Sequence, residues 1–197
     1  MVPLCLTIAG SDSGGGAGVQ ADLKAFAAAG CYGMSAIVAL TAQNTTGVTA
    51  VHELPADFVR AQLDAVYADI GVDAAKTGML FSRAAIETVA DFLDGRGTPL
   101  VVDPVMIASS GASLLQGDAV KTLVSRLFPL ATVVTPNLYE AEALAGSGSR
   151  RELAERIHEL GAPAVLVTGG HGDEAVDHLF DGEHHVEIPV ERVGDAQ

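Results

Sequence analysis

Short apolar runs alternate with amphipathic segments along most of the chain. The apolar run at 4–9 is followed by a glycine-rich stretch at 10–16 and then by 17–29, in which apolar side chains recur at helical spacing. Short uninterrupted apolar runs are typical of buried strands, and three- to four-residue spacing is typical of helices with one buried face. The repeated alternation predicts an α/β layer fold with a mainly parallel sheet.

The same pattern predicts a single domain of residues 1–197, without an internal repeat or a linker. Strands are expected at 4–9, 34–40, 48–54, 74–77, 100–102, 132–135 and 164–167, followed by a hairpin of 175–180 and 184–189. Helices are expected at 17–29, 55–70, 82–93, 118–128, 138–145 and 151–160. Pro55 lies where a helix tolerates proline, Ser82 is a good N-cap residue, and Asp181-Gly182 is typical of a hairpin turn.

Composition narrows the class of protein. Apolar residues make up 49% and charged residues 18% of the 197 residues, which excludes a disordered chain. A domain of this length buries about 70% of its extended-chain surface, so it needs no metal or disulfide to hold its core. No apolar run approaches the roughly 18 residues of a membrane helix. The N-terminus lacks the basic flank of a signal peptide.

The chain is strongly acidic, because 25 Asp and Glu stand against 11 Lys and Arg, a net charge of −14. This balance excludes a broad nucleic-acid surface, which needs clustered Lys and Arg. An anionic ligand must therefore be held by backbone amides or by a metal ion. Cys5 and Cys31 are too few for a disulfide scaffold, and we expect free buried thiols in a reducing compartment. These features predict a cytoplasmic protein without a nucleic-acid or membrane partner.

The stretch 10–18 places four glycines in five positions between a strand and a helix. Glycine lets a backbone approach a ligand closely, and the following helix offers free N-terminal amides. The phosphate-loop pattern is absent, because no Lys-Ser or Lys-Thr pair follows the glycines. The dinucleotide pattern fails in its spacing, and Leu40 and Thr41 stand where its acidic residue is expected. The alternative is a flexible turn without a ligand, but we favour a ligand site because so many glycines are costly for a turn.

A longer match includes this loop. The stretch 8–24 (IAGSDSGGGAGVQADLK) resembles the opening of the hydroxymethylpyrimidine/phosphomethylpyrimidine kinases of thiamine biosynthesis, members of the ribokinase-like superfamily. Further matches follow in order at 40–45 (LTAQNT), 76–80 (KTGML), 102–106 (VDPVM), 135–141 (TPNLYEA) and 169–171 (GGH). The resemblance implies a ribokinase-like three-layer α/β/α sandwich that phosphorylates 4-amino-5-hydroxymethyl-2-methylpyrimidine and its monophosphate. It also implies ATP as co-substrate, Mg²⁺ as cofactor and a homodimer.

The resemblance assigns Gly10, Asp22, Gln43 and Met79 to the pyrimidine substrate. Gln43 follows a buried strand, and its carboxamide can pair with a ring nitrogen and an exocyclic amine. Without the resemblance, Gln43 is an ordinary loop amide and Asp22 a solvated helix residue. Asp22 matches a position near the substrate hydroxymethyl group. By pattern alone Met79 is a core residue, since flexible thioethers fill gaps well.

Three oxygen-bearing residues, Asp103, Asn137 and Glu140, match the magnesium side of the family's site. Asp103 ends a strand just before Pro104, and a carboxylate there could hold Mg²⁺ directly or through water. Asn137 and Glu140 resemble the superfamily's Asn-x-x-Glu motif, whose members ligate magnesium-bound water. A structural role is the alternative, because Asn137 is a competent N-cap and Glu140 is favourable in the first turn of a helix.

Thr168 and Gly170 follow a strand and are expected to approach the nucleotide. Many relatives carry lysine at the position of Thr168, so a hydroxyl stands here where the family places an ammonium group. Lys76 is interpreted as structural. The histidines lack metal-ligand spacing and are expected at the surface, namely at 52, 158, 178, 184 and 185.

The catalytic segment of the family is not matched. Ribokinase-like enzymes carry a glycine-rich anion hole that opens a helix, with cysteine or aspartate at the catalytic position. That residue is expected beyond Gln197, and Gly194-Asp195 is rejected as its equivalent. The sequence thus predicts no catalytic residue within 1–197, a C-terminally truncated fold and exposed apolar surface on one side of the sheet. A pyridoxal/pyridoxine kinase of the same superfamily and a catalytically silent ligand-binding fragment are the alternatives.

Overall fold

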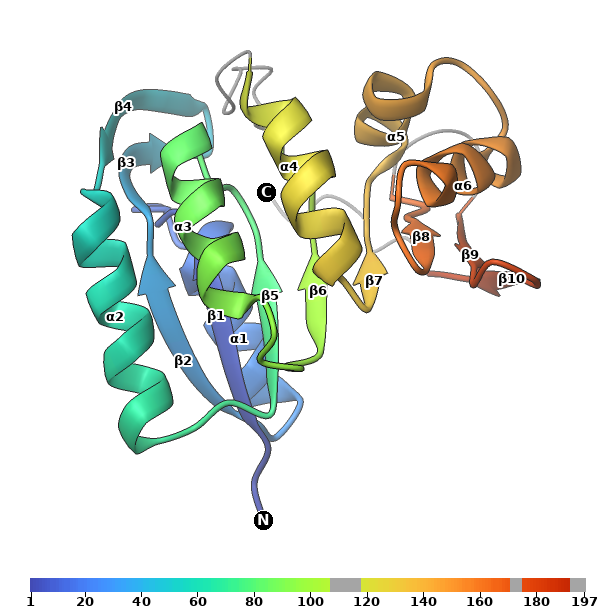
Figure 1. The fold of residues 1–197 in the computed structure, drawn as a ribbon. Coiled ribbons are helices and arrows are strands. Elements are labelled where there is room, and N and C mark those ends of the chain that lie inside the picture. The colour runs from blue at the N-terminus through green and yellow to red at the C-terminus, as the bar shows by residue number, and fades with distance from the viewer. Residues whose placement is uncertain (107–117, 171–174, 192–197) are drawn as a thin grey trace.

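Eight strands form one sheet through the middle of the protein, seen in a computed structural model that describes residues 1–106, 118–170 and 175–191 (Figure 1). Their order is β10-β9-β8-β7-β6-β5-β1-β2. The strands from β2 to β8 in this order all pair parallel with their neighbours, whereas β9 pairs antiparallel with both β8 and β10. The strands are β1 Leu4–Ala9, β2 Tyr32–Ile37, β5 Ala74–Thr77, β6 Leu100–Val102, β7 Val133–Val134, β8 Val165–Val167, β9 Val176–Phe180 and β10 His185–Pro189. The prediction of a mainly parallel sheet is confirmed.

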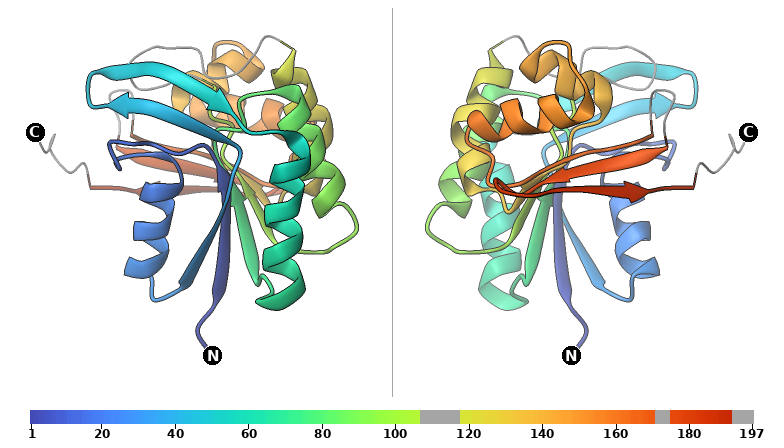
Figure 2. Two further views of the ribbon diagram at one scale, coloured as in Figure 1. Left: turned by 90° about the vertical axis from the view of Figure 1, so that its left-hand side faces the viewer. Right: turned by 90° about the vertical axis from the view of Figure 1, so that its right-hand side faces the viewer.

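Helices lie on both faces of this sheet and complete three layers. They are α1 Gly18–Ala28, α2 Ala56–Asp69, α3 Arg83–Leu93, α4 Ala119–Leu127, the short 3₁₀ helix Phe128–Leu130, α5 Leu138–Ala145 and α6 Arg150–Glu159. Figure 2 shows α1 on one face and α2 to α6 on the other. The ribokinase-like α/β/α architecture expected from the resemblance is therefore confirmed. No helix in the described ranges is long and apolar enough to cross a membrane.

The face of the sheet that carries α1 has a row of incompletely covered apolar side chains. Val101 lies in register with Lys76 and Val133, and Val101 and Val133 are only half-buried, as is Leu166 of β8. At the sheet edge, Val186 and Ile188 are 47% and 41% exposed. The apolar surface expected on one side of the sheet is present on these strands.

The predicted strand at 34–40 is wrong as a single element. The main-sheet strand ends at Ile37, the chain bends at Val38, and β3 Ala39–Asn44 pairs antiparallel with β4 Gly47–Glu53 in a separate two-stranded sheet. The bend is held where the amide of Val38 donates to the carbonyl of Ala9 and that of Ser11 to the carbonyl of Ala39. The apolar run continues through the bend without Gly or Pro, so the sequence carried no local signal for it.

Most other bounds agree with the pattern. The predicted elements at 4–9, 74–77, 100–102 and 138–145 have the observed bounds, and the hairpin is formed by β9 and β10. Ser82 is an N-cap, because its side chain accepts a hydrogen bond from the amide of Ala85. His171 and the pair Gly194-Asp195 lie outside the described residues.

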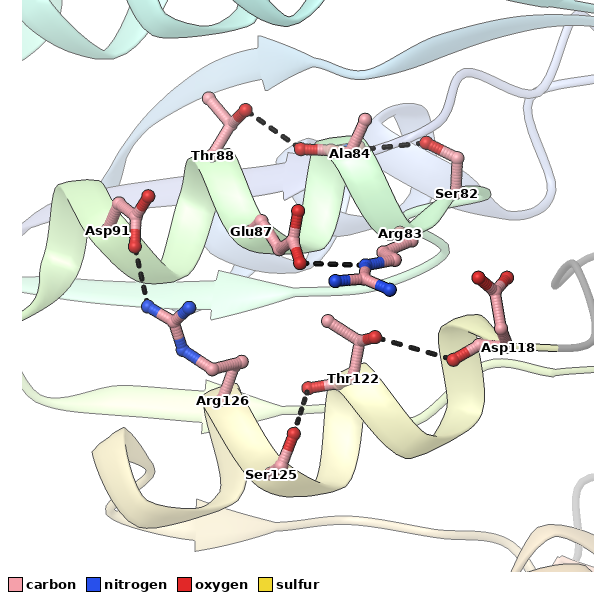
Figure 3. A network of polar contacts seen from close by, with 11 residues as sticks. Ser82, Arg83, Ala84, Glu87, Thr88, Asp91, Asp118, Thr122, Ser125 and Arg126 are labelled. Carbon is pink, nitrogen blue, oxygen red and sulfur yellow. Dashed lines mark hydrogen bonds and ion pairs between the residues drawn. The ribbon is translucent and has the colours of Figure 1, made fainter.

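The outer surface of α3 and α4 is polar and lies away from the glycine-rich loop. Figure 3 shows Arg126 of α4 paired with Asp91 of α3, and Arg83 paired with Glu87 within α3. These side chains are 36–61% exposed, so each pair contributes at most about 1 kcal/mol to stability. The layer is instead held by its buried apolar face, which includes Val89 of α3.

Candidate functional site

A cavity of about 250 Å³ opens at the carboxyl ends of β1, β5 and β6, beside the glycine-rich loop and β3. This is where open α/β sheets place their ligands. Five residues singled out from the sequence line it: Gly10, Asp22, Gln43, Met79 and Asp103. They come from four separate parts of the chain, so only the fold brings them together.

The remaining predicted residues lie outside the lining of this cavity. Asn137 and Thr168 are neighbours across a parallel bridge that continues the ends of β7 and β8. Glu140 is buried in the first turn of α5, at 4% exposure, whereas Gly170 is exposed. The structure therefore places Asn137 and Thr168 side by side, next to the cavity residues but not among them.

The amides of the glycine-rich loop are occupied by the chain itself. The buried carboxylate of Asp12 accepts hydrogen bonds from the amides of Gly14, Gly16 and Ala17 at 2.8–2.9 Å. These hydrogen bonds occupy three amides just before α1 that an anion could otherwise use. The expectation that loop amides hold an anionic ligand is corrected for these three, and the loop also contributes a wall of the cavity.

Two glycines make close approaches at this wall. A Cβ at Gly10 would lie 2.1 Å from Cε of Met79, and the amide of Gly10 donates to the carbonyl of Met79 at 2.9 Å. Gly18 has a φ of +57°, and a Cβ there would lie 2.5 Å from the carbonyl oxygen of Gly10. Met79 is 8% exposed and belongs both to the core and to the cavity wall, so its two sequence interpretations are compatible.

Gln43 is held at the cavity by the glycine-rich loop. The hydroxyl of Ser13 donates to the carbonyl of Gln43 at 2.6 Å and accepts from its amide at 2.8 Å. Thr41 donates its hydroxyl to the carbonyl of Ser11 at 2.8 Å, with the side-chain oxygen of Gln43 farther away at 3.3 Å. The backbone of Gln43 is thus clamped while its carboxamide remains half-buried at the cavity.

Lys76, interpreted from the sequence as structural, lies at the cavity. Its ammonium group lines the cavity and lies 2.9 Å from Oδ1 of Asp22 and 3.3 Å from Oδ2 of Asp103. The other oxygen of Asp22 accepts a hydrogen bond from the hydroxyl of Thr7 at 2.6 Å. A lysine inside a short, otherwise buried strand of an acidic chain was the available signal, because such a charge needs a partner.

In the cluster of Lys76, Asp22 and Asp103, attraction between opposite charges favours the charged forms and burial disfavours them. Burial lowers the pKa of Lys76, but the carboxylates of Asp103 and Asp22 outweigh it and hold that pKa above its usual value. Burial raises the pKa of Asp103, and Lys76 only partly offsets this effect. The ammonium group is consequently the more firmly charged member, and burial of the Asp103 carboxylate is costly.

Asn137 and Glu140 form a capping box at the start of α5. The amide of Asn137 donates to Oε2 of Glu140 at 2.9 Å, and Oδ1 of Asn137 accepts from the amide of Glu140 at 3.0 Å. Asn137 and Glu140 therefore cap α5, as an asparagine at the N-cap position predicts. Burial, with a contribution from the charge of Asp103, raises the pKa of Glu140 to about 7.

The residues that could hold a metal ion are few. In 1–106, 118–170 and 175–191, no group of three or more His, Cys, Asp or Glu side chains is arranged to hold one. Asp103 and Glu140 carry carboxylates, and Oε2 of Glu140, like Oδ1 of Asn137, is engaged in the capping box. Two carboxylates suit Mg²⁺, which commonly keeps several waters and substrate phosphates as its other ligands.

Of the histidines expected at the surface, His178 is buried and His185 is half-buried between the terminal hairpin and α6. His178 is 5% exposed, its Nε2 lies 2.8 Å from Nδ1 of His185, and Nε2 of His185 lies 3.0 Å from a carboxylate oxygen of Glu155. Burial, together with the proximity of His185, lowers the pKa of His178. This cluster lies outside the cavity lining.

Cys5 and Cys31 also lie outside the cavity lining. Both are free thiols, as expected, but each is half-buried instead of buried. Burial and the neighbouring Cys31 raise the pKa of Cys5, which makes its thiol a weaker nucleophile at neutral pH.

Comparisons with known proteins identify relatives of this chain. The matching protein family is described as phosphomethylpyrimidine kinase, and the match covers residues 12–197. The hydroxymethylpyrimidine/phosphomethylpyrimidine kinase of Rhizobium meliloti (strain 1021) is 53% identical over 201 residues, covering 98% of this chain and 76% of the relative. The thiamine biosynthesis bifunctional protein ThiED of Geobacter sulfurreducens is 55% identical, covering 90% of this chain and 38% of that protein.

Solved structures show the same fold. The crystal structure of phosphomethylpyrimidine kinase from Clostridium difficile 630 has a TM-score of 0.87 and 45% identity, covering 96% of this chain and 85% of that one. An ADP complex of Bacillus subtilis pyridoxal kinase also has a TM-score of 0.87, with 39% identity, covering 100% of this chain and 78% of that one. Since the family match extends over nearly all of the sequence and the fold agrees as well, the chain belongs to the phosphomethylpyrimidine kinase family.

Proposed function

We propose that this chain binds 4-amino-5-hydroxymethyl-2-methylpyrimidine and its monophosphate and serves their phosphorylation by ATP. The observation that carries the proposal is the convergence of Gln43, Asp22 and Asp103 on one cavity. Its relatives from several bacteria are named hydroxymethylpyrimidine/phosphomethylpyrimidine kinases. A cavity of about 250 Å³ is small, which suits a single substituted pyrimidine ring.

Each cavity residue has a role that follows from its chemistry. The carboxamide of Gln43 can donate to a ring nitrogen and accept from the exocyclic amine, a pairing that selects an aminopyrimidine edge. Gly10 and Met79 provide an apolar wall for the ring. Asp22 accepts a hydrogen bond from the substrate hydroxyl and orients its oxygen. Phosphoryl transfer depends mainly on such positioning and on neutralisation of the phosphate charges.

The phosphate side of the site involves Asp103, Glu140, Thr168 and Gly170. Asp103 and Glu140 would hold Mg²⁺ through their carboxylates, and the ion would neutralise phosphate charge. Thr168 would contribute a hydroxyl, and Gly170 an open backbone position, to the nucleotide. Gly169 between them fixes the turn, since a Cβ there would lie 2.5 Å from the backbone of Val176.

The test separates binding from turnover. Isothermal titration with 4-amino-5-hydroxymethyl-2-methylpyrimidine is expected to show one site per chain, and Gln43→Leu is expected to weaken binding at least about tenfold. The thermal unfolding midpoint of the variant serves as the control for folding. A wild-type chain that binds no pyrimidine would contradict the proposal. Release of ADP that requires both pyrimidine and Mg²⁺ would establish the kinase reaction, whereas binding without ADP release would favour the catalytically silent alternative.

Pyridoxal phosphorylation is a second candidate function, favoured by the structural likeness to the pyridoxal kinase of Bacillus subtilis. Pyridoxal lacks the aminopyrimidine edge that Gln43 would recognise. Titration of pyridoxal against bound pyrimidine therefore distinguishes the two. Weaker binding of pyridoxal that is insensitive to Gln43→Leu supports the pyrimidine assignment.

We further propose a homodimer located in the cytoplasm. Half-buried free thiols are compatible with a reducing compartment, and sedimentation equilibrium of the purified chain tests its oligomeric state.

A further inference from the structure

Lys76 is the only cation among the described residues that line the cavity, which also has three acidic residues, two of them paired with Lys76. The acidic lining residues are Asp12, Asp22 and Asp103. A neutral alcohol meets no electrostatic penalty there. A phosphate monoester adds about 1.5 to 2 negative charges at neutral pH, so it needs a positive partner to bind in the same place.

Several backbone amides beside this lining already have acceptors within the chain. Asp12 accepts hydrogen bonds from the amides of Gly14, Gly16 and Ala17, and the amide of Val19 in the first turn of α1 donates to the carbonyl of Gly10. Lys24, which donates to the carbonyl of Gly15, does not line the cavity. A phosphate held at the Asp22 end of the cavity must therefore meet Lys76.

The geometry of Lys76 leaves it able to do so. An ammonium group has three donors, and Asp22 and Asp103 account for two of them. The side chain is 22% exposed and therefore reachable from the cavity. Gly78 lines the cavity next to it, and a Cβ at this glycine would lie 3.3 Å from the ammonium nitrogen. The missing side chain at Gly78 keeps the approach to Lys76 open.

We propose that Lys76 is the residue that admits the phosphorylated pyrimidine, by giving its phosphate the one positive partner in an acidic cavity. With the alcohol bound, the ammonium group remains between Asp22 and Asp103. With the monophosphate bound, it shares its charge with the phosphate, which offsets the repulsion from the two carboxylates. This inference rests on the proposed pyrimidine site and goes beyond it in assigning the phosphate subsite to one residue.

The test compares two ligands on the same chain in the absence of ATP. Calorimetric affinities are measured for 4-amino-5-hydroxymethyl-2-methylpyrimidine and for its monophosphate. Lys76→Met is expected to weaken monophosphate binding by about tenfold or more relative to alcohol binding, because a charged hydrogen bond to phosphate is lost. Lys24→Met removes the same charge beside the same loop and is expected to leave the ratio of the two affinities within about twofold.

A second variant keeps the inference testable if Lys76→Met does not fold. Asp103→Asn removes a carboxylate that lies 3.3 Å from the ammonium group of Lys76, competes for it and would repel the phosphate. Asp103 has no assigned contact with the alcohol, so the affinity ratio should move toward the monophosphate. An equal loss of both ligands in Lys76→Met, or an unchanged ratio in Asp103→Asn, would overturn the role of Lys76 alone. Wild-type chain that binds the alcohol but not the monophosphate would overturn it as well. Wild-type chain that binds neither ligand would overturn the proposed function, and this inference with it.

Discussion

Replacing Asp12 with alanine removes the acceptor of three backbone hydrogen bonds, from the amides of Gly14, Gly16 and Ala17. Bonds to a charged group contribute about 1.5–3 kcal/mol each when the donors stay buried, and about 1 kcal/mol each when water can replace the acceptor. The three donor residues are exposed, so the lower value applies, and the expected loss is about 3 kcal/mol. That is a large part of the roughly 5–15 kcal/mol that stabilises a typical domain.

Urea unfolding followed by circular dichroism at 222 nm measures this loss. Asp64→Ala is the matched control, because it removes a carboxylate that is 53% exposed and paired only within α2, 3.1 Å from Arg60. The control is expected to cost no more than about 0.5 kcal/mol. Asp12→Asn, which keeps one acceptor oxygen, should lie between the wild type and Asp12→Ala. If Asp12→Ala unfolds within 0.5 kcal/mol of the control, the carboxylate does not hold the loop, and the account of the occupied amides is wrong.

Three further outcomes follow from the contacts. Gly10→Ala should weaken pyrimidine binding several-fold, since its Cβ would lie 2.1 Å from Cε of Met79 and displace that side chain at the cavity wall. The added Met79→Ala substitution should partly restore the affinity, and no rescue in calorimetry would contradict the steric explanation. Ser13→Ala should weaken pyrimidine binding several-fold with little change in thermal midpoint, because the exposed Ser13 clamps the loop to β3; an equal loss of stability would refute this separation. The lowered pKa of His178 means that the unfolded chain binds a proton at a higher pH than the folded chain does, so the free energy of unfolding should fall as pH drops below about 6.5. Urea titrations at pH 8 and pH 5.5 should show a smaller difference for His178→Gln than for the wild type, and an unchanged difference would exclude this contribution.

Local signals were sufficient for most elements of the fold. An apolar run predicts the strand Leu4–Ala9, and N-cap residues predict the helix starts at Ser82 and Asn137. Each of these signals acts over only a few neighbouring residues. Such effects depend on backbone sterics and hydrogen bonds that the sequence displays directly. Five substrate and metal candidates also converge as expected, because the resemblance and the strand ends both directed them to one edge of the sheet.

Two of the contacts that the sequence left open join residues far apart in the chain. The bend at Val38 is held by a carbonyl of β1, and the charge of Lys76 is balanced by Asp22, 54 residues away. Asp12 is near its partners in the chain, but its carboxylate reaches three amides only because the loop folds back over it. The sequence by itself determined most of the strands, the helices and the family of this protein, since these follow from local periodicity and motifs. Only the tertiary structure decided which charges meet in the cavity and which loop amides are already occupied, because Coulomb and hydrogen-bond energies depend on distances in space and not on separation along the chain.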